Sequence, residues 1–242
     1  MPRILGAEPD NSYTWPDLTP QSCTPEFRCQ SMDVPESTRN PGSVETISPN
    51  GDVILVVGPQ TVRLRVHSLF LRSASKVFNA MLGPNWSEGQ GLSEECPPEV
   101  SLEEGNPESL RIICNVIHHQ NDNVPDKPPP EQVLQIAIET DKYDLTVAMK
   151  YAAAQWQERS DTLTTIERGY LMASAFLFDD ADRFATHTLE LVLNHTGPYL
   201  QLLDDGRISQ VLPWKTLCMY QFRGYYSGGQ LLDLDTLLIY DS

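Results

Sequence analysis

Positive charge is scarce in this chain of 242 residues: 17 Lys and Arg side chains stand against 33 Asp and Glu, a formal net charge of −16. No local run of Lys or Arg offsets this balance. A strongly negative field repels the phosphates of nucleic acids and the head groups of anionic lipids. We therefore expect neither nucleic acid nor a membrane surface as a direct partner. Partner proteins with basic surfaces are expected instead.

Long apolar runs are also missing. No window approaches the roughly 18 apolar residues of a membrane-spanning helix, and residues 1–10 lack the apolar stretch of a secretory signal. The five cysteines are odd in number and scattered, which is unlike a disulfide framework and typical of reduced thiols. These features predict a cytoplasmic or nuclear protein.

Catalytic signatures are missing as well: there is no Gly-rich phosphate loop, nucleophile elbow, His-Glu-x-x-His or Cys-x-x-Cys pair. The alternative rests on Cys114, His118 and His119. Cys114 and His118 are four residues apart, so they share a helix face and could supply two of four metal ligands. Equally, Cys114 can belong to a buried stripe and the histidines to a helix end, where cationic character is favourable. We favour this second interpretation and expect a protein that is not an enzyme, with no metal, cofactor or small-molecule substrate.

The two ends of the chain show little periodicity. Residues 1–49 hold eight of the 19 prolines and many Ser, Thr and Asn side chains. Too few apolar side chains are present to offset the conformational entropy lost on ordering. We expect a disordered, Pro-rich acidic arm there. Residues 213–242 are aromatic and Gly-rich without a clean period, and the sequence leaves their structure uncertain.

Strand patterns begin after the arm. Asp52 is followed by an unbroken apolar run up to Val57 that is rich in β-branched side chains, typical of a strand buried on both faces. Gly58 begins a turn, and residues 61–66 then alternate apolar with Arg side chains, as in a strand with one face in the core. Together these segments predict a β-hairpin. A brief third strand is predicted at Val100 and Leu102.

Helical periodicity dominates the remainder. A short helix at residues 69–71 precedes a second helix that Ser75 can cap. Asn106 is suited to the N-cap and Pro107 to the first position of another helix, and Pro130 can begin a further one. Three more helices are expected over residues 145–156, 163–178 and 182–194.

The order of these elements predicts an α+β fold. A small three-stranded sheet is marginal unless helices cover it, and the apolar stripes of the predicted helices supply that cover. We expect one domain over residues 50–158, followed by a short helical extension over residues 159–212.

Four stretches have a familiar order and spacing. They are Asp52 to Val57; Val66-His67 through Leu71, Ser75 and Phe78; Asn106-Pro107 with its following helix; and Ala137 to Asp144, which contains Asp141-Lys142-Tyr143. Taken together they resemble the BTB/POZ domain family, in the divergent form common in fungal proteins. The resemblance implies the three-stranded sheet with its helical cover.

The resemblance also implies a set of fold-defining positions. We expect Phe78 to fill the core, His67 to orient the strand-to-helix turn and Asp141 to fix a helix end. Tyr143 would need a hydrogen-bond partner for its hydroxyl if buried. The complete set is Asp52, His67, Leu71, Ser75, Phe78, Asp141 and Tyr143.

BTB/POZ domains bind proteins, so the resemblance implies an interaction module. Members of the family commonly form homodimers, and many recruit a cullin scaffold for ubiquitin transfer. Two mechanisms stay open for this chain. In one, the domain is a dimerising platform, and the arm or residues 159–242 capture a second partner. In the other, the chain is a monomeric adaptor between a cullin-type ubiquitin ligase and its substrate.

Overall fold

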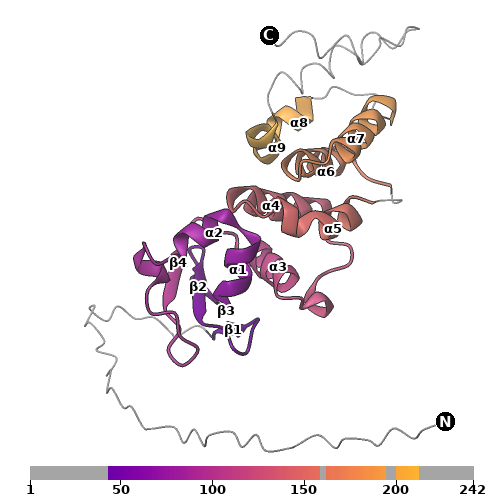
Figure 1. Ribbon diagram of the computed structural model, residues 1–242. Coiled ribbons are helices and arrows are strands. Elements are labelled where there is room, and N and C mark those ends of the chain that lie inside the picture. Colours follow the sequence, from indigo (N-terminus) through magenta and orange to yellow (C-terminus); the bar gives the residue numbers. More distant parts are fainter. Residues whose placement is uncertain (1–42, 159–161, 195–199, 213–242) are drawn as a thin grey trace, which may run out of the picture. The chain divides into compact units, whose positions relative to one another are not determined.

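The computed structural model describes residues 43–158, 162–194 and 200–212 (Figure 1). The predicted arm up to residue 42 and the tail 213–242 therefore lie outside the described residues. Within the described ranges the α+β class predicted from the sequence is confirmed, with one small sheet and a larger helical part. No helix among the described residues is long and apolar enough to cross a membrane.

The sheet within these ranges is mixed, with strand order β1-β3-β2-β4. Strands β2 (Val53–Val57) and β3 (Val62–Val66) form the predicted antiparallel hairpin, and β4 (Glu99–Leu102) runs parallel to β2. A fourth strand, β1 (Glu45–Thr46), pairs in parallel with β3. The prediction of three strands is thus corrected, and β1 falls inside the stretch 1–49 that was predicted to be disordered. Two residues are too few to show an alternating pattern.

The hairpin turn needs a left-handed backbone at two positions, Gly58 with φ of 66° and Thr61 with φ of 53°. Glycine adopts this conformation without steric cost. A Cβ atom at Gly58 would also lie 2.9 Å from the carbonyl oxygen of Gly105. The turn therefore requires glycine for both backbone freedom and space.

Strand β2 has one fully buried face, which corrects the prediction that both faces are buried. Every second residue from Val53 has no solvent exposure, whereas Ile54 and Val56 are only partly buried. Their cross-strand neighbours on β3 are Arg65 and Arg63 respectively. Long charged side chains on that face keep it in contact with solvent.

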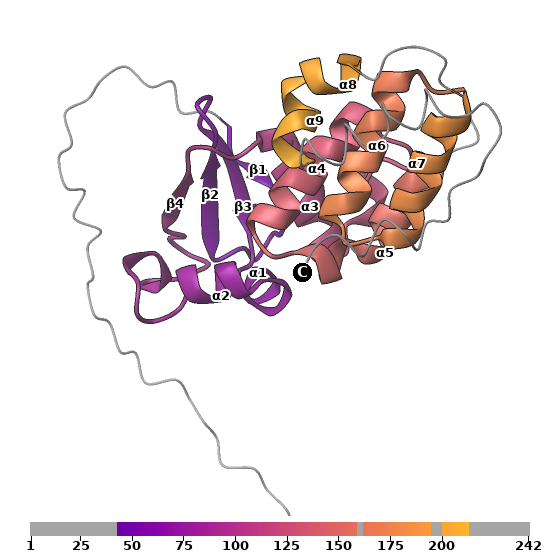
Figure 2. The same cartoon turned by 90° about the horizontal axis from the view of Figure 1, so that it is seen from above.

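Five helices accompany the sheet (Figure 2). Helices α1 (Ser68–Ala74) and α2 (Lys76–Met81) lie at one end of the strands, and α3 (Pro107–Ile117) packs beside β3. Helix α4 (Pro130–Lys142) and helix α5 (Thr146–Gln157) complete the cover. Single 3-10 turns occur at Ser87–Gly89, before β4, and at Asn121–Asn123, before α4.

The predicted start signals of these helices are confirmed. Ser75 Oγ accepts a hydrogen bond from the Phe78 amide at 2.9 Å, and Asn106 Oδ1 accepts one from the Ser109 amide at 3.0 Å. Pro107 and Pro130 are the first residues of α3 and α4. Ser75 and Asn106 each pair an amide that the start of a helix would otherwise leave unpaired. Pro107 and Pro130 have no amide proton that needs a partner.

Four helices follow the domain in the described ranges. Helices α6 (Thr165–Leu177) and α7 (Ala181–Asn194) match the two predicted from periodicity. Helices α8 (Leu200–Asp204) and α9 (Gly206–Val211) were not predicted. A capping box begins α6, in which Thr164 and Glu167 exchange hydrogen bonds with each other's backbone amides.

Helix α4 joins two hydrophobic cores. Val133, Ile136 and Ala137 belong to the core beneath the sheet, whereas Leu134 packs with Tyr170 of α6 in a second core. Figure 2 shows the sheet on one side of α3 and α4, and α6 and α7 on the other. The helices after residue 158 are therefore packed directly against the domain.

Close approach of α6 to α8 and α9 depends on one glycine. A Cβ atom at Gly169 would lie 2.5 Å from Leu202 Cδ2 and 2.8 Å from Ile208 Cδ1. Both leucine and isoleucine side chains are fully buried. A larger residue at this position would require the ends of the Leu202 and Ile208 side chains to shift.

Candidate interaction site

The turn from β3 into α1 is built by two of the predicted family positions. The Asp52 carboxylate accepts hydrogen bonds from the Ser68 amide at 2.6 Å and from the Ser68 hydroxyl at 2.7 Å. His67 is the N-cap residue of α1, and its Nδ1 accepts from the Leu69 amide at 3.3 Å. This geometry agrees with the expectation that His67 orients the strand-to-helix turn.

His118 is held by backbone groups on both sides of its ring. Its Nε2 accepts from the His67 amide at 2.9 Å, and its Nδ1 donates to the Cys114 carbonyl at 2.8 Å. Burial lowers the pKa of His118 from its ordinary value. The expectation of cationic character at this helix end is thus wrong for His118, because both ring contacts suit the neutral imidazole.

The structure does not bring together the three side chains of the metal alternative as one site. Cys114 is buried, and burial raises the pKa of its thiol to about 12. His119 is exposed, has φ of 61°, and places its ring edge-on to Phe70 with centroids 5.9 Å apart. No group of three or more metal-ligating side chains occurs among residues 43–158, 162–194 and 200–212.

A second set of family positions locks α2 onto the end of α4. The rings of Phe78 and Tyr143 are stacked with centroids 4.8 Å apart, and both residues are at least nine-tenths buried. The Ser75 hydroxyl donates to the Tyr143 carbonyl while it caps α2. Leu71 is fully buried in the same core. Burial raises the pKa of the Tyr143 hydroxyl to about 12.

Asp141 contributes to the helix end through its backbone. Its carbonyl accepts from the Asp144 amide at 3.1 Å, where Asp144 has φ of 50° and ends α4. The Asp141 side chain is exposed, so a role for its carboxylate at the helix end stays a prediction.

Sequence periodicity missed the exposed apolar face of α5. Val147 is 88% exposed and Tyr151 is 87% exposed, one helical turn apart. Apolar character alone would place Val147 in the core, but the buried apolar face of this helix consists of Met149, Ala153 and Trp156. Helix α5 therefore has a second apolar face, turned to solvent.

Helix α2 contacts the segment between α4 and α5. Lys76 and Asp144 form an ion pair with an N–O separation of 3.5 Å. We call Val147 and Tyr151 the α5 face.

A groove of about 650 Å³ lies between the hairpin turn, the start of α3, α4 and α9. Its walls carry several carboxylates and two arginines, Arg111 and Arg207. Sequence reasoning missed Glu139, which lines this groove from α4 and is 4% exposed. Its Oε1 accepts from the Asn106 amide at 2.7 Å. A polar residue beside an apolar stripe gives no sequence signal of burial, because that burial comes from packing against α3.

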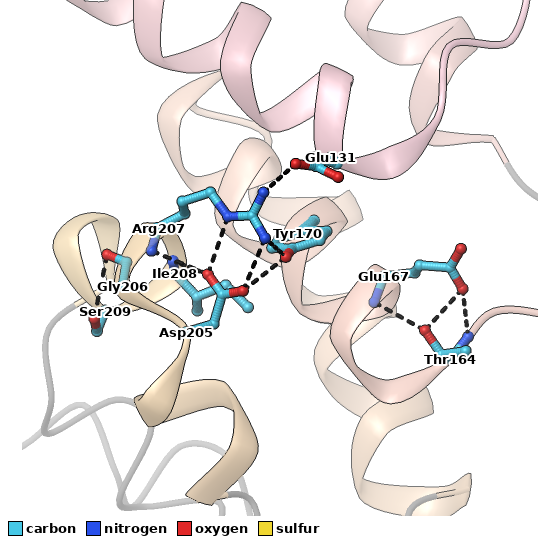
Figure 3. A network of polar contacts seen from close by, with 9 residues as sticks. All are labelled: Glu131, Thr164, Glu167, Tyr170, Asp205, Gly206, Arg207, Ile208 and Ser209. Carbon is cyan, nitrogen blue, oxygen red and sulfur yellow. Dashed lines mark hydrogen bonds and ion pairs between the residues drawn. The ribbon is translucent and has the colours of Figure 1, made fainter.

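A polar network attaches α9 to the wall of the groove (Figure 3). Asp205 caps α9 by accepting from the Arg207 and Ile208 amides, and it accepts from the Tyr170 hydroxyl at 2.7 Å. Arg207 also binds the Asp205 carboxylate and Glu131 of α4. The Arg207 guanidinium holds the pKa of Asp205 at about 2, well below its usual range. Burial raises the pKa of Tyr170 to about 12.

The fold and these side chains define a class of protein. Most of the predicted family positions build helix caps and core, while several large apolar side chains are exposed to solvent. Residues 48–158 match the family profile of the BTB/POZ domain. The chain thus contains a BTB/POZ domain, and this match confirms the resemblance drawn from the sequence. BTB/POZ domains are protein–protein interaction modules. No curated protein matches the chain.

Proposed function

We propose that this chain is an adaptor whose BTB/POZ domain binds a partner protein through the α5 face. The observation that carries the proposal is the exposure of Val147 and Tyr151 on a helix whose opposite face is buried in the core. Solvent-exposed pairs of large apolar side chains mark interaction sites when they are contiguous. Tyrosine is also enriched among the residues that dominate binding energy, since it combines apolar area with a polar end.

The resemblance suggests a cullin scaffold as the partner on this face. Many BTB/POZ domains recruit one, and the net charge of −16 favours a partner with a basic surface. A chain that binds a ligase scaffold through α5 keeps its other surfaces free to hold a substrate. We place this adaptor in the cytoplasm or the nucleus, as the number and scatter of its cysteines suggest.

The test is a binding measurement between the full chain and a purified cullin N-terminal domain. The double variant Val147→Asp, Tyr151→Asp introduces two charges on the α5 face without touching a buried side chain. We expect at least about tenfold weaker binding, because each carboxylate would have to be desolvated against an apolar partner. Absence of any cullin binding by the wild-type chain would contradict the cullin proposal.

A matched control exists on α7. Leu189 and Leu193 are 57% and 70% exposed and also lie one turn apart. The double variant Leu189→Asp, Leu193→Asp makes the same change in charge, and we expect it to alter cullin affinity by less than about threefold. Equal losses in the two double variants would show a general charge effect and would refute the role of the α5 face.

Homodimerisation is the second candidate, and one observation favours it. In the described sheet β1 is an edge strand, and it is paired on one side only, with Leu64 and Arg65 of β3. An uncovered strand edge invites pairing with another chain. Light scattering distinguishes the candidates: a mass near 27.2 kDa at micromolar concentration would identify a monomer and exclude the dimer, and twice that mass would support it.

A further inference from the structure

The groove beside α4 has an unusual balance of charge. Nearly every charged side chain on its walls is already paired. Arg111 lies 3.8 Å from both Glu45 and Glu108, and Glu104 lies 3.5 Å from Lys142. The second arginine of the groove, in α9, is held by the network of Figure 3.

Glu139 is the exception among the described residues of the groove. One carboxylate oxygen, Oε1, accepts from the Asn106 amide, but the other, Oε2, has no hydrogen-bond partner. Burial of a carboxylate oxygen without a donor is costly, and that cost is removed when a donor arrives. Burial also raises the pKa of Glu139, although the amide of Asn106 and the charge of Lys142 act in the opposite direction. The groove thus has an acceptor in place and no donor to fill it.

The groove reaches the sheet. Glu45 of β1 and Val62 of β3 both line it, together with Gln60 of the hairpin turn. A segment bound in the groove would therefore lie between the sheet and α4.

We propose that this groove binds an extended segment of a partner protein and receives one of its Lys or Arg side chains, which donates a hydrogen bond to Glu139 Oε2. Charge favours this occupant: the walls supply Glu45, Glu104, Glu108 and Glu139 against two arginines that are already paired. Oε2 is shielded from solvent, so entry requires rotation of side chains that line the groove, among which Gln135 and Gln210 are uncharged. The site lies outside the α5 face and does not depend on cullin binding.

The experiment is selection from a random peptide library on the full chain, followed by affinity measurement of the enriched peptides. We expect enriched peptides to share a Lys or Arg, and its replacement by norleucine to weaken binding at least about tenfold. Glu139→Gln keeps the acceptor for Asn106 and removes the negative charge. We expect it to lose the same factor, and the two changes together to cost little more than either alone.

Glu104→Gln is the matched control. It removes the same charge from the same groove, but Glu104 is exposed and paired with Lys142. We expect it to weaken peptide binding by less than about threefold. Circular dichroism and a thermal unfolding curve verify that both variants fold.

Three results would overturn the proposal. The first is failure to enrich any peptide, which would mean that the groove holds solvent only. The second is enrichment of peptides without a shared basic residue. The third is an equal effect of Glu139→Gln and Glu104→Gln, which would reduce the interaction to the general negative field of the chain. None of these results bears on the α5 face, whose cullin measurement stands separately.

Discussion

The Ser75 hydroxyl connects two parts of the domain, which makes Ser75→Ala the most informative single change. As an acceptor it caps α2 through the Phe78 amide, and as a donor it binds the Tyr143 carbonyl at the end of α4. Ser75 is 3% exposed and Tyr143 is 4% exposed. Water therefore cannot replace the hydroxyl when alanine removes it.

The expected loss of stability is the sum of two effects. Removal of a Ser N-cap costs about 1 kcal/mol, with a range of about 0.5–2 kcal/mol. A buried carbonyl left without its donor costs about 1–3 kcal/mol more. The free energy of unfolding should therefore fall by about 2–4 kcal/mol, although only one oxygen atom is removed.

Chemical denaturation followed by circular dichroism measures this difference, and Ser73→Ala is its control. Ser73 lies two residues away, is exposed, and donates to the Phe70 carbonyl at 3.0 Å. Its loss should change stability by no more than about 0.5 kcal/mol, since water can replace an exposed hydroxyl. A loss below about 1 kcal/mol for Ser75→Ala, or equal losses in the two variants, would refute the bridging role of the hydroxyl.

Three further outcomes are expected. Phe78→Ala should lower the free energy of unfolding by about 3–5 kcal/mol in the same assay, because a fully buried ring stacked on Tyr143 is lost. The pKa of Glu139 is raised in the folded chain above the unfolded value of about 4.3. The contribution of Glu139 to folding stability is therefore present at pH values below about 4.3 and is lost as pH rises through the folded pKa. Glu139→Gln should remove this dependence, so that unfolding curves of variant and wild type diverge in favour of the variant as pH rises. Asp205 has a folded pKa of about 2, so the stability that its carboxylate gives α9 is present above the unfolded pKa of about 3.9 and is lost as pH falls toward about 2. Asp205→Asn should therefore lower the hydrogen-exchange protection of α9 at neutral pH. Unchanged protection would contradict this role.

Local signals explain why much of the domain could be predicted from the sequence. The alternation of Val62, Leu64 and Val66 with arginines identifies β3, and Asn106-Pro107 identifies the start of α3. Each of these signals acts within a few residues of the chain, through side-chain alternation or through one unpaired amide. They survive in the folded structure because the tertiary packing agrees with them.

Features set by distant contacts could not be predicted. Strand β1 is two residues long and exists because β3 offers it an edge. Helices α8 and α9 are five and six residues long, too short to show periodicity, and they are held by packing against α6, as at Gly169. Val147 has the apolar character of a core residue, and only the packing of α5 decides that it faces solvent.

The candidate interaction sites escaped prediction for a related reason. The family positions that the sequence made visible, such as Ser75 and Phe78, are buried and hold the fold together. Glu139 and Tyr151 carry no comparable pattern, because their importance arises from what lies opposite them: the start of α3 in one case and solvent in the other. Sequence resemblance therefore identifies the class of the domain, and the geometry is needed to find where it binds.

Helix α4 links the fold to both proposed activities. One face of it builds the core beneath the sheet, Leu134 builds the core shared with α6, and Glu139 lines the groove. Tyr143, at its end, connects through Ser75 to α2, and Lys76 of α2 pairs with Asp144 just before α5. Because packed interiors transmit strain, a partner that displaces α4 at the groove would also shift the segment that leads into α5. The two sites are therefore joined by one element, and a peptide bound in the groove can alter affinity for a partner at the α5 face only to the extent that it changes the position of α4.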